Sequence, residues 1–171
     1  GRPVRLQWTR QQEMANSPMG AAMTVTVEAG VDDAGNLQSW KQEVWSQGHG
    51  TRPGRGKTPS LLGAWQTANP APVTMAVNQP PNTGGGSDRN ATPPYAIPEV
   101  HVVNHRVLAM PLRVSALRSL GAHVNVLAAE STIDEIAKDF DRDPLAYRLD
   151  HLKDVRAIAV LQEAARISGW G

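Results

Sequence analysis

Residues 23–45, MTVTVEAGVDDAGNLQSWKQEVW, decide the fold class. The first part has an apolar residue at every second position, at Met23, Val25, Val27, Ala29 and Val31. This is the period-two pattern of a half-buried strand. The cluster DDAGN at 32–36 is typical of a turn, and a second strand-like run follows it. The sequence therefore predicts a β-hairpin over residues 22–46.

The N-terminal residues show the same alternation over a shorter span. Val4, Leu6 and Trp8 are separated by Arg5, Gln7 and Thr9. We therefore expect a further strand here, so that residues 1–46 consist of strands and a hairpin.

Residues 47–98 have a different composition. The runs SQGHGTRPGRGKTPS (46–60) and NQPPNTGGGSDRNATPP (78–94) are dense in Gly, Pro, Ser and Asn and predict an irregular loop. Between them, LLGAWQTA (61–68) fits one or two helical turns. A loop of this length is often functional or loosely ordered, and a surface excursion without chemistry is an equal alternative.

Residues 99–171 predict one strand followed by helices. The run EVHVVNHRVLAMP (99–111) predicts a strand that ends at Pro111. The helical signals are an apolar stripe, an Asp-Pro start and a final Asp start that leads to a Gly stop. The apolar stripe consists of Val126, Ala129, Ile133, Ile136 and Phe140. The Asp-Pro start is Asp143-Pro144, and the final Asp start is Asp154, with the stop at Gly169. Strands followed by about three helices predict an α+β fold, with antiparallel strands, in one domain over residues 1–171.

Composition excludes several classes of protein. Lys and Arg number 17 against 16 Asp and Glu, and the arginines do not interleave with the few aromatic residues, so nucleic-acid binding is not predicted. The absence of cysteine excludes disulfides, thiolate metal sites and cysteine nucleophiles within this chain. No apolar run reaches the roughly 18 residues of a membrane span.

No catalytic residue or metal site is predicted in these residues. The five histidines are dispersed, and His101 and His105 would lie about 13 Å apart on a strand. Ser115, Ser119 and Ser131 lack the Gly-x-Ser-x-Gly context of a serine hydrolase.

Two acidic residues lie four apart on one predicted helical face. Glu130 and Asp134 would repel each other unless a cation lies between them. We expect Glu130 to form a structural ion pair with a nearby arginine such as Arg113 or Arg118, in preference to acting as a catalytic acid.

The turn LRSLGAHVN (117–125) is the most informative local element. Gly121 permits a close approach of the backbone to a ligand, and the helix that follows offers unpaired N–H groups to an anion. Many loops place a Gly before a helix, so an ordinary connection is the alternative that local physics favours.

The run MPLRVSALRSLGAHVNVLAAESTIDEIAKDFDRDPLAYRLDHLKD (110–154) resembles the molybdopterin-binding subunit of the molybdenum hydroxylases, the family of xanthine dehydrogenase and aldehyde oxidase. The similarity is greatest to the branch of isoquinoline 1-oxidoreductase beta subunits and nicotinate-dehydrogenase-like large subunits. Further shared segments are GRPVRLQWTR (1–10), EVWSQGHGTRPG (43–54), GGGSDRNATPPY (84–95) and AARISGWG (164–171).

The resemblance implies a site in the turn at 117–125. Arg118, Leu120 and Gly121 would contact the molybdenum cofactor, Arg118 through its backbone, and Leu120 would also face the substrate. The xanthine dehydrogenase branch has an aromatic residue in place of Leu120, so a differently shaped substrate is expected. Arg89 would be a second substrate-binding residue, with a surface arginine as the alternative.

The resemblance also implies an activity and partners. The activity is hydroxylation of an aldehyde or an N-heteroaromatic compound, with water as the oxygen source. The partners are the remainder of the large subunit, a 2Fe-2S subunit, a cytochrome c and the small-molecule substrate. The family's general base and glycine-rich cofactor loop have no match here, so we expect an internal part of a longer subunit that is inactive and free of cofactor on its own. The alternative from another class is a non-catalytic association or scaffold domain.

Overall fold

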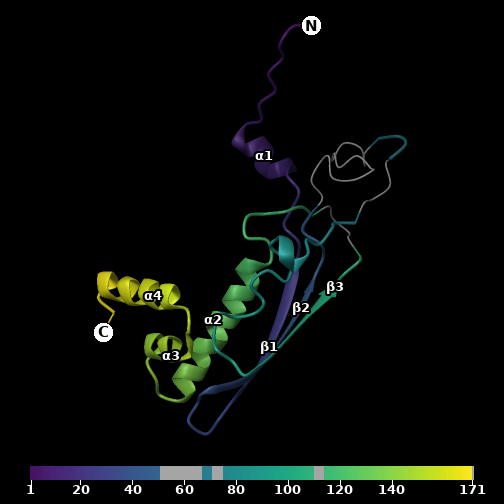
Figure 1. The fold of residues 1–171 in the computed structure, drawn as a ribbon. Helices are drawn as coiled ribbons and strands as arrows, with labels where there is room; N and C mark the ends of the chain where they lie inside the picture. Colours follow the sequence, from purple (N-terminus) through teal and green to yellow (C-terminus); the bar gives the residue numbers. More distant parts are fainter. Residues whose placement is uncertain (51–66, 71–74, 110–113, 171) are drawn as a thin grey trace.

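The structure is a computed structural model, and it describes residues 1–50, 67–70, 75–109 and 114–170. These residues form a three-stranded sheet with helices on one of its faces, which confirms the α+β fold (Figure 1). The elements in chain order are α1 (Arg10–Asn16), β1 (Met23–Val31), β2 (Leu37–Ser46), the short 3-10 helix η2 (Pro81–Thr83), β3 (Glu99–Arg106), α2 (Ala122–Asp139), α3 (Pro144–His151) and α4 (Val155–Ser168).

The predicted hairpin is confirmed. β1 and β2 pair antiparallel, with Met23 opposite Ser46 and Ala29 opposite Trp40. Asp32 holds the turn, because its carboxylate accepts the backbone N–H groups of Ala34 at 3.0 Å and of Asn36 at 2.8 Å. The hydrogen bonds from Asn36 hold the pKa of Asp32 below its usual value.

The third strand lies where the sequence predicts it, but its predicted direction is wrong. β3 pairs with β2 in parallel, with Ser39 opposite Glu99 and Ser46 opposite Arg106, so the sheet is mixed. The strand ends at Arg106, before Pro111, which lies outside the described residues. A parallel pair needs a crossover connection, and residues 47–98 provide it.

The described part of the crossover is irregular, as predicted, apart from η2 and a single bridge between Gly50 and Val77. The predicted helical turns at 61–68 fall mainly outside the described residues. Thr67 and Ala68 form a bend.

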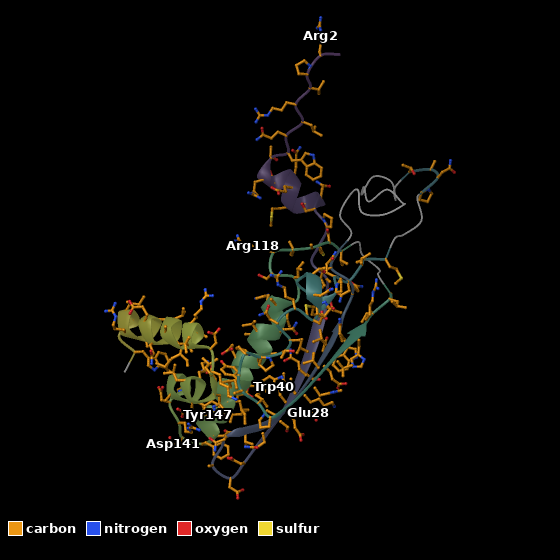
Figure 2. The ribbon with its side chains drawn as sticks, in the orientation of Figure 1. Arg2, Glu28, Trp40, Arg118, Asp141 and Tyr147 are labelled. Carbon is orange, nitrogen blue, oxygen red and sulfur yellow. The ribbon has the colours of Figure 1, made fainter. Side chains whose placement is uncertain are left out.

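The core lies between α2 and one face of the sheet. Its largest fully buried side chains include Trp40 on β2, Ile133 on α2 and Tyr147 on α3. Figure 2 shows Trp40 and Tyr147 on the side of the sheet that α2 covers. The predicted stripe of α2 is correct at Ala129 and Ile133 and is wrong at its ends. Val126 and Phe140 are exposed, and the buried positions there are Asn125 and Ala137.

The last two helices begin and end as predicted. The Asp143 side chain accepts the N–H of Ala146 at 2.7 Å, and Pro144 occupies the first helical position. Asp154 accepts the N–H of Arg156 at 2.9 Å, and Gly169 ends α4 with a left-handed φ of 68°.

Glu130 does form an ion pair, but with a different arginine. Arg148 of α3 donates to Glu130 at 2.8 Å and to Asp134 at 2.6 Å, and therefore lies between the two carboxylates. Tyr95 also donates to Glu130, at 2.8 Å, and burial together with this carboxylate raises the pKa of the Tyr95 hydroxyl. Arg118 is not a partner of Glu130, and Arg113 lies outside the described residues. The ion pair fastens α3 to α2.

The predicted N-terminal strand is absent. Residues 1–9 are exposed and form neither helix nor strand, and α1 follows them. Thr9 and Gln12 form a capping box that starts α1, so Thr9 marks the beginning of a helix and not the end of a strand. No helix in the described part of the chain is long and apolar enough to cross a bilayer.

Candidate functional site

The turn that precedes α2 has an unusual backbone. Ser119 and Leu120, which are not glycines, both adopt left-handed conformations with φ of 79° and 54°. Two internal hydrogen bonds close the turn, from the Leu120 N–H to the Leu117 carbonyl and from the Ala122 N–H to the Ser119 carbonyl, both at 3.0 Å. Each left-handed non-glycine residue costs about 1–3 kcal/mol and persists only where the surroundings impose it.

The loop at residues 84–89 packs against the end of this turn at Gly121. The Gly121 N–H donates to the Gly86 carbonyl at 3.0 Å. A Cβ atom added at Gly121 would lie 2.2 Å from the Ser87 carbonyl oxygen, so only glycine fits. The close approach that the sequence indicated at Gly121 is therefore an approach of protein backbone, and the 84–89 loop fills the space beside its Cα.

A buried asparagine locks the same loop to α2. The Asn125 side chain is fully buried and its amide donates to the Ser87 carbonyl at 2.7 Å and to the Arg89 carbonyl at 2.9 Å. Its oxygen accepts the amide of Gln42, from the centre of β2, at 3.1 Å. Asn125 thus joins the sheet, the helix and the loop in one network.

The network extends to both sides of Asn125. The Trp40 indole donates to the Gln42 side-chain oxygen at 3.2 Å. The Ser87 hydroxyl lies 3.1 Å from the side-chain oxygen of Asn78 and 3.0 Å from that of Asn104. Satisfied buried polar groups of this kind fix a single arrangement, because any shift leaves a group without a partner.

The turn presents its other side to the surface. Arg118 is exposed and forms no hydrogen bond or ion pair with any residue that the structure describes (Figure 2). Leu117 is exposed, and Leu120 is half-buried. Arg89 belongs to the loop that contacts Gly121, and its side chain is exposed. The structure therefore brings together the two segments that carry the four predicted site residues.

The hydrogen-bond donors of the turn determine which of its residues could bind an anionic cofactor. The backbone N–H groups of Leu120, Gly121 and Ala122 are all used within the protein. The N–H groups of Arg118 and Ser119, the Ser119 hydroxyl and the Arg118 guanidinium donate to no residue in the described ranges. Arginine is well suited to bind phosphate and carboxylate oxygens. An anionic cofactor therefore fits Arg118 and Ser119, and does not fit the amides of the next three residues.

The histidines do not gather around a metal position. Within the described residues, no group of three His, Asp or Glu side chains could hold a metal ion. His105 lies on the open face of the sheet, where it stacks on Trp45 with ring centroids 4.6 Å apart and bonds Glu43 at 3.1 Å. This hydrogen bond from His105 holds the pKa of Glu43 below its usual value.

Sequence reasoning missed the residues that hold the site, above all Asn125, Gln42 and Ser87. One signal for Asn125 was available. It precedes Ala129, Ile133 and Ala137 at steps of four, so it occupies the buried stripe of α2. Gln42 and Ser87 carried no comparable signal, because their burial depends on contacts between segments distant in sequence.

Comparison with known proteins gives relatives along nearly the whole chain. A nicotinate dehydrogenase subunit of Pseudomonas putida is 31% identical over 169 residues, which are 99% of this chain and 13% of that protein. The beta subunit of isoquinoline 1-oxidoreductase of Brevundimonas diminuta is 24% identical over an alignment of 172 positions, which covers 99% of this chain and 20% of that protein. A probable xanthine dehydrogenase subunit of Bacillus subtilis is 22% identical over 95% of this chain and 18% of its own length. No family model matches the chain.

These relatives are subunits of oxidoreductases, and the chain spans only 13–20% of their length. Three differently named enzymes match across at least 95% of the chain, so the similarity covers the sheet, the crossover and the helices alike. The chain is therefore similar, over nearly its whole length, to one part of each of these dehydrogenase and oxidoreductase subunits.

Proposed function

We propose that this chain forms one wall of the cofactor and substrate site of a molybdenum-dependent oxidoreductase. The substrate class is an aldehyde or an N-heteroaromatic compound, hydroxylated with oxygen from water. The complete enzyme would combine the chain with the remaining length of such a subunit, a 2Fe-2S protein and a cytochrome c. When bound, the cofactor supplies the oxidation itself, and the chain supplies binding and orientation.

One observation carries the proposal. The left-handed pair Ser119–Leu120 is held in place by buried contacts on one side, while Arg118 faces the surface on the other. Backbone strain that the surroundings enforce is concentrated at binding and catalytic sites. The same turn is where the sequence resembles the cofactor loop of the family.

The residues of the turn and of the neighbouring loop would have different roles. Arg118 and Ser119 have donors that pair with no described residue and that would bind the oxygens of an anionic cofactor. Leu120, which is half-buried, would offer an apolar contact to the substrate. Arg89 would contribute a polar contact from the neighbouring loop, and Gly121 would hold the turn against that loop.

The test uses the complete subunit that carries these residues, with molybdenum measured by mass spectrometry and pterin by fluorescence. We expect both to be present, and Arg118→Ala to lower molybdenum content or hydroxylation activity by at least about tenfold. Arg156→Ala removes an exposed arginine from α4 and serves as the matched control.

Two results would contradict the proposal. One is a complete subunit that contains neither molybdenum nor pterin. The other is an Arg118→Ala subunit with the metal content and activity of the unmodified protein. The 171-residue chain alone should show no turnover in either case.

A further inference from the structure

The N-terminal arm, residues 1–9, has the sequence of a strand without the structure of one. Val4 is 92% exposed and Leu6 is 85% exposed. The backbone of residues 1–8 forms no hydrogen bond with any described residue. α1, which follows the arm, buries none of its residues, and Met14 on it is also exposed.

An arm of this kind matches the open edge of a β-sheet. Its apolar side chains alternate with polar ones, so they would all lie on one face once the arm is extended beside another strand. The edge strand of a sheet has unpaired backbone N–H and C=O groups, and the backbone of the arm needs partners of the same kind. Strand addition pairs the backbone groups of the arm with those of the edge. Arg2 and Arg5 give the arm positive charge, with no acidic residue before Glu13.

The segment that follows α1 lies beside the turn that carries Arg118. Met19 forms a parallel bridge with Val114, and the Ser115 N–H donates to the Met19 carbonyl at 2.9 Å. The Leu117 side chain covers Gly20. In Figure 1, the arm and α1 extend from the end of the molecule where α2 begins, away from the β1–β2 turn.

This position connects the arm with the proposed site. The side chains of Met19 and Leu117 lie where the segment after α1 meets the turn, and both are largely exposed. A polypeptide that pairs with residues 3–8 and continues back along α1 would reach the turn that carries Arg118.

We propose that residues 3–8 add as an edge strand to a β-sheet of another polypeptide segment, and that this segment also covers the Arg118 turn. The receiving edge has an apolar face for Val4, Leu6 and Trp8 and, on its other face, an acidic side chain opposite Arg5. The segment is part of the remaining length of the subunit, since the chain spans only 13–20% of its relatives. The covering of the Arg118 turn rests on the proposed function, because the cofactor would bind between this turn and the added segment.

Hydrogen exchange measured by mass spectrometry tests the pairing. In the 171-residue chain, the amides of residues 4–8 should exchange as in an unstructured peptide, and the chain should be monomeric by light scattering. In the complete subunit, the same amides and those of Arg118 and Ser119 should exchange at least about 100-fold more slowly. Free exchange of the arm in the complete subunit would overturn the inference. So would a dimeric 171-residue chain with a protected arm, because the partner would then be a second copy.

A pair of variants tests which face of the arm is covered. Leu6→Asn places a polar amide on the apolar face and should abolish the protection in the complete subunit, whereas Gln7→Asn, on the polar face, should preserve it. Both residues are exposed and contact nothing in the core, so neither change should alter unfolding of the 171-residue chain. Equal effects of the two changes would overturn the proposed strand.

The outcome is separate from that of the proposed function. A complete subunit without molybdenum or pterin but with a protected arm would refute the cofactor site and leave the strand addition standing. A subunit that contains the cofactor while its arm exchanges freely would refute the strand addition alone.

Discussion

Asn125 is the residue at which the sheet, helix α2 and the 84–89 loop meet. Its amide and its oxygen are both used, and the side chain has no contact with solvent. An asparagine in a buried helical stripe is costly unless its polar groups are paired. Here the paired groups belong to three separate segments, so this side chain fixes where the turn at 117–121 lies.

Replacing Asn125 with Ala should destabilise the chain. The carbonyls of Ser87 and Arg89 and the amide of Gln42 would each lose a buried partner, which costs about 1–3 kcal/mol in the free energy of unfolding. Urea unfolding followed by circular dichroism measures the change. Asn82→Ala, at an exposed position of η2, is the control and should leave the midpoint nearly unchanged. Equal midpoints for the two variants would show that the network is not stabilising.

Among the elements, α2 has the closest contact with the sheet. Its buried positions recur at steps of four, which gives one apolar row with Asn125 at its start. Arg148 fastens α3 to the same helix by lying between Glu130 and Asp134. The helix therefore joins the sheet on one side and α3 on another.

Ile133→Asp should be the most damaging change on α2. Ile133 is fully buried beside Trp40 and Tyr147 in the core, and an unpaired carboxylate there should lower the free energy of unfolding by more than about 3 kcal/mol. Ser131→Asp introduces the same charge at an exposed position of the same helix. Thermal unfolding compares the two variants, and a small effect at Ile133 would mean that α2 is not packed as described.

Elements with local signals could be predicted from the sequence. The hairpin follows from alternation around DDAGN, and the starts of α3 and α4 follow from Asp143 and Asp154, because each signal lies within the element it defines. The direction of β3 could not be predicted, because it depends on the path of residues 47–98. The alternation at Val4, Leu6 and Trp8 did not produce a strand, since a strand also needs a neighbouring edge.

The candidate site was predictable only in part. The turn and Gly121 are visible in the sequence, whereas the left-handed φ angles of Ser119 and Leu120 are not, because the turn packs at Gly121 against the 84–89 loop, which is distant in sequence. The partner of Glu130 was missed for a similar reason. Arg148 comes close to Glu130 only after α3 turns back on α2.

For the molecule as a whole, a buried histidine makes stability depend on pH. His49 is buried and lies 3.3 Å from the Ser46 hydroxyl, and burial lowers its pKa, with the charge of Asp88 opposing the shift. The unfolded chain takes up this proton near about pH 6.5, and the folded chain only at lower pH. The contribution of His49 to stability is therefore complete above about pH 6.5 and is lost as the pH falls below that value.

Urea midpoints at about pH 7.5 and about pH 5.5 test this dependence. The unmodified chain should be less stable at the lower pH, and His49→Gln should reduce the difference between the two midpoints. His123→Gln changes an exposed histidine and should keep the full difference. An unchanged difference in the His49 variant would show that another group causes the dependence.

The parallel pairing of β2 with β3 also sets an order of assembly. The hairpin closes over the five residues 32–36, while β3 can join β2 only after the chain has closed a loop over residues 47–98. Loop-closure entropy makes such distant pairing slow, and contact between neighbouring segments fast. The hairpin should therefore form first in refolding, and the arrival of β3 should limit the rate. The 84–89 loop reaches Gly121 from within that crossover, so the strained turn should acquire its final geometry only in this last, slow phase.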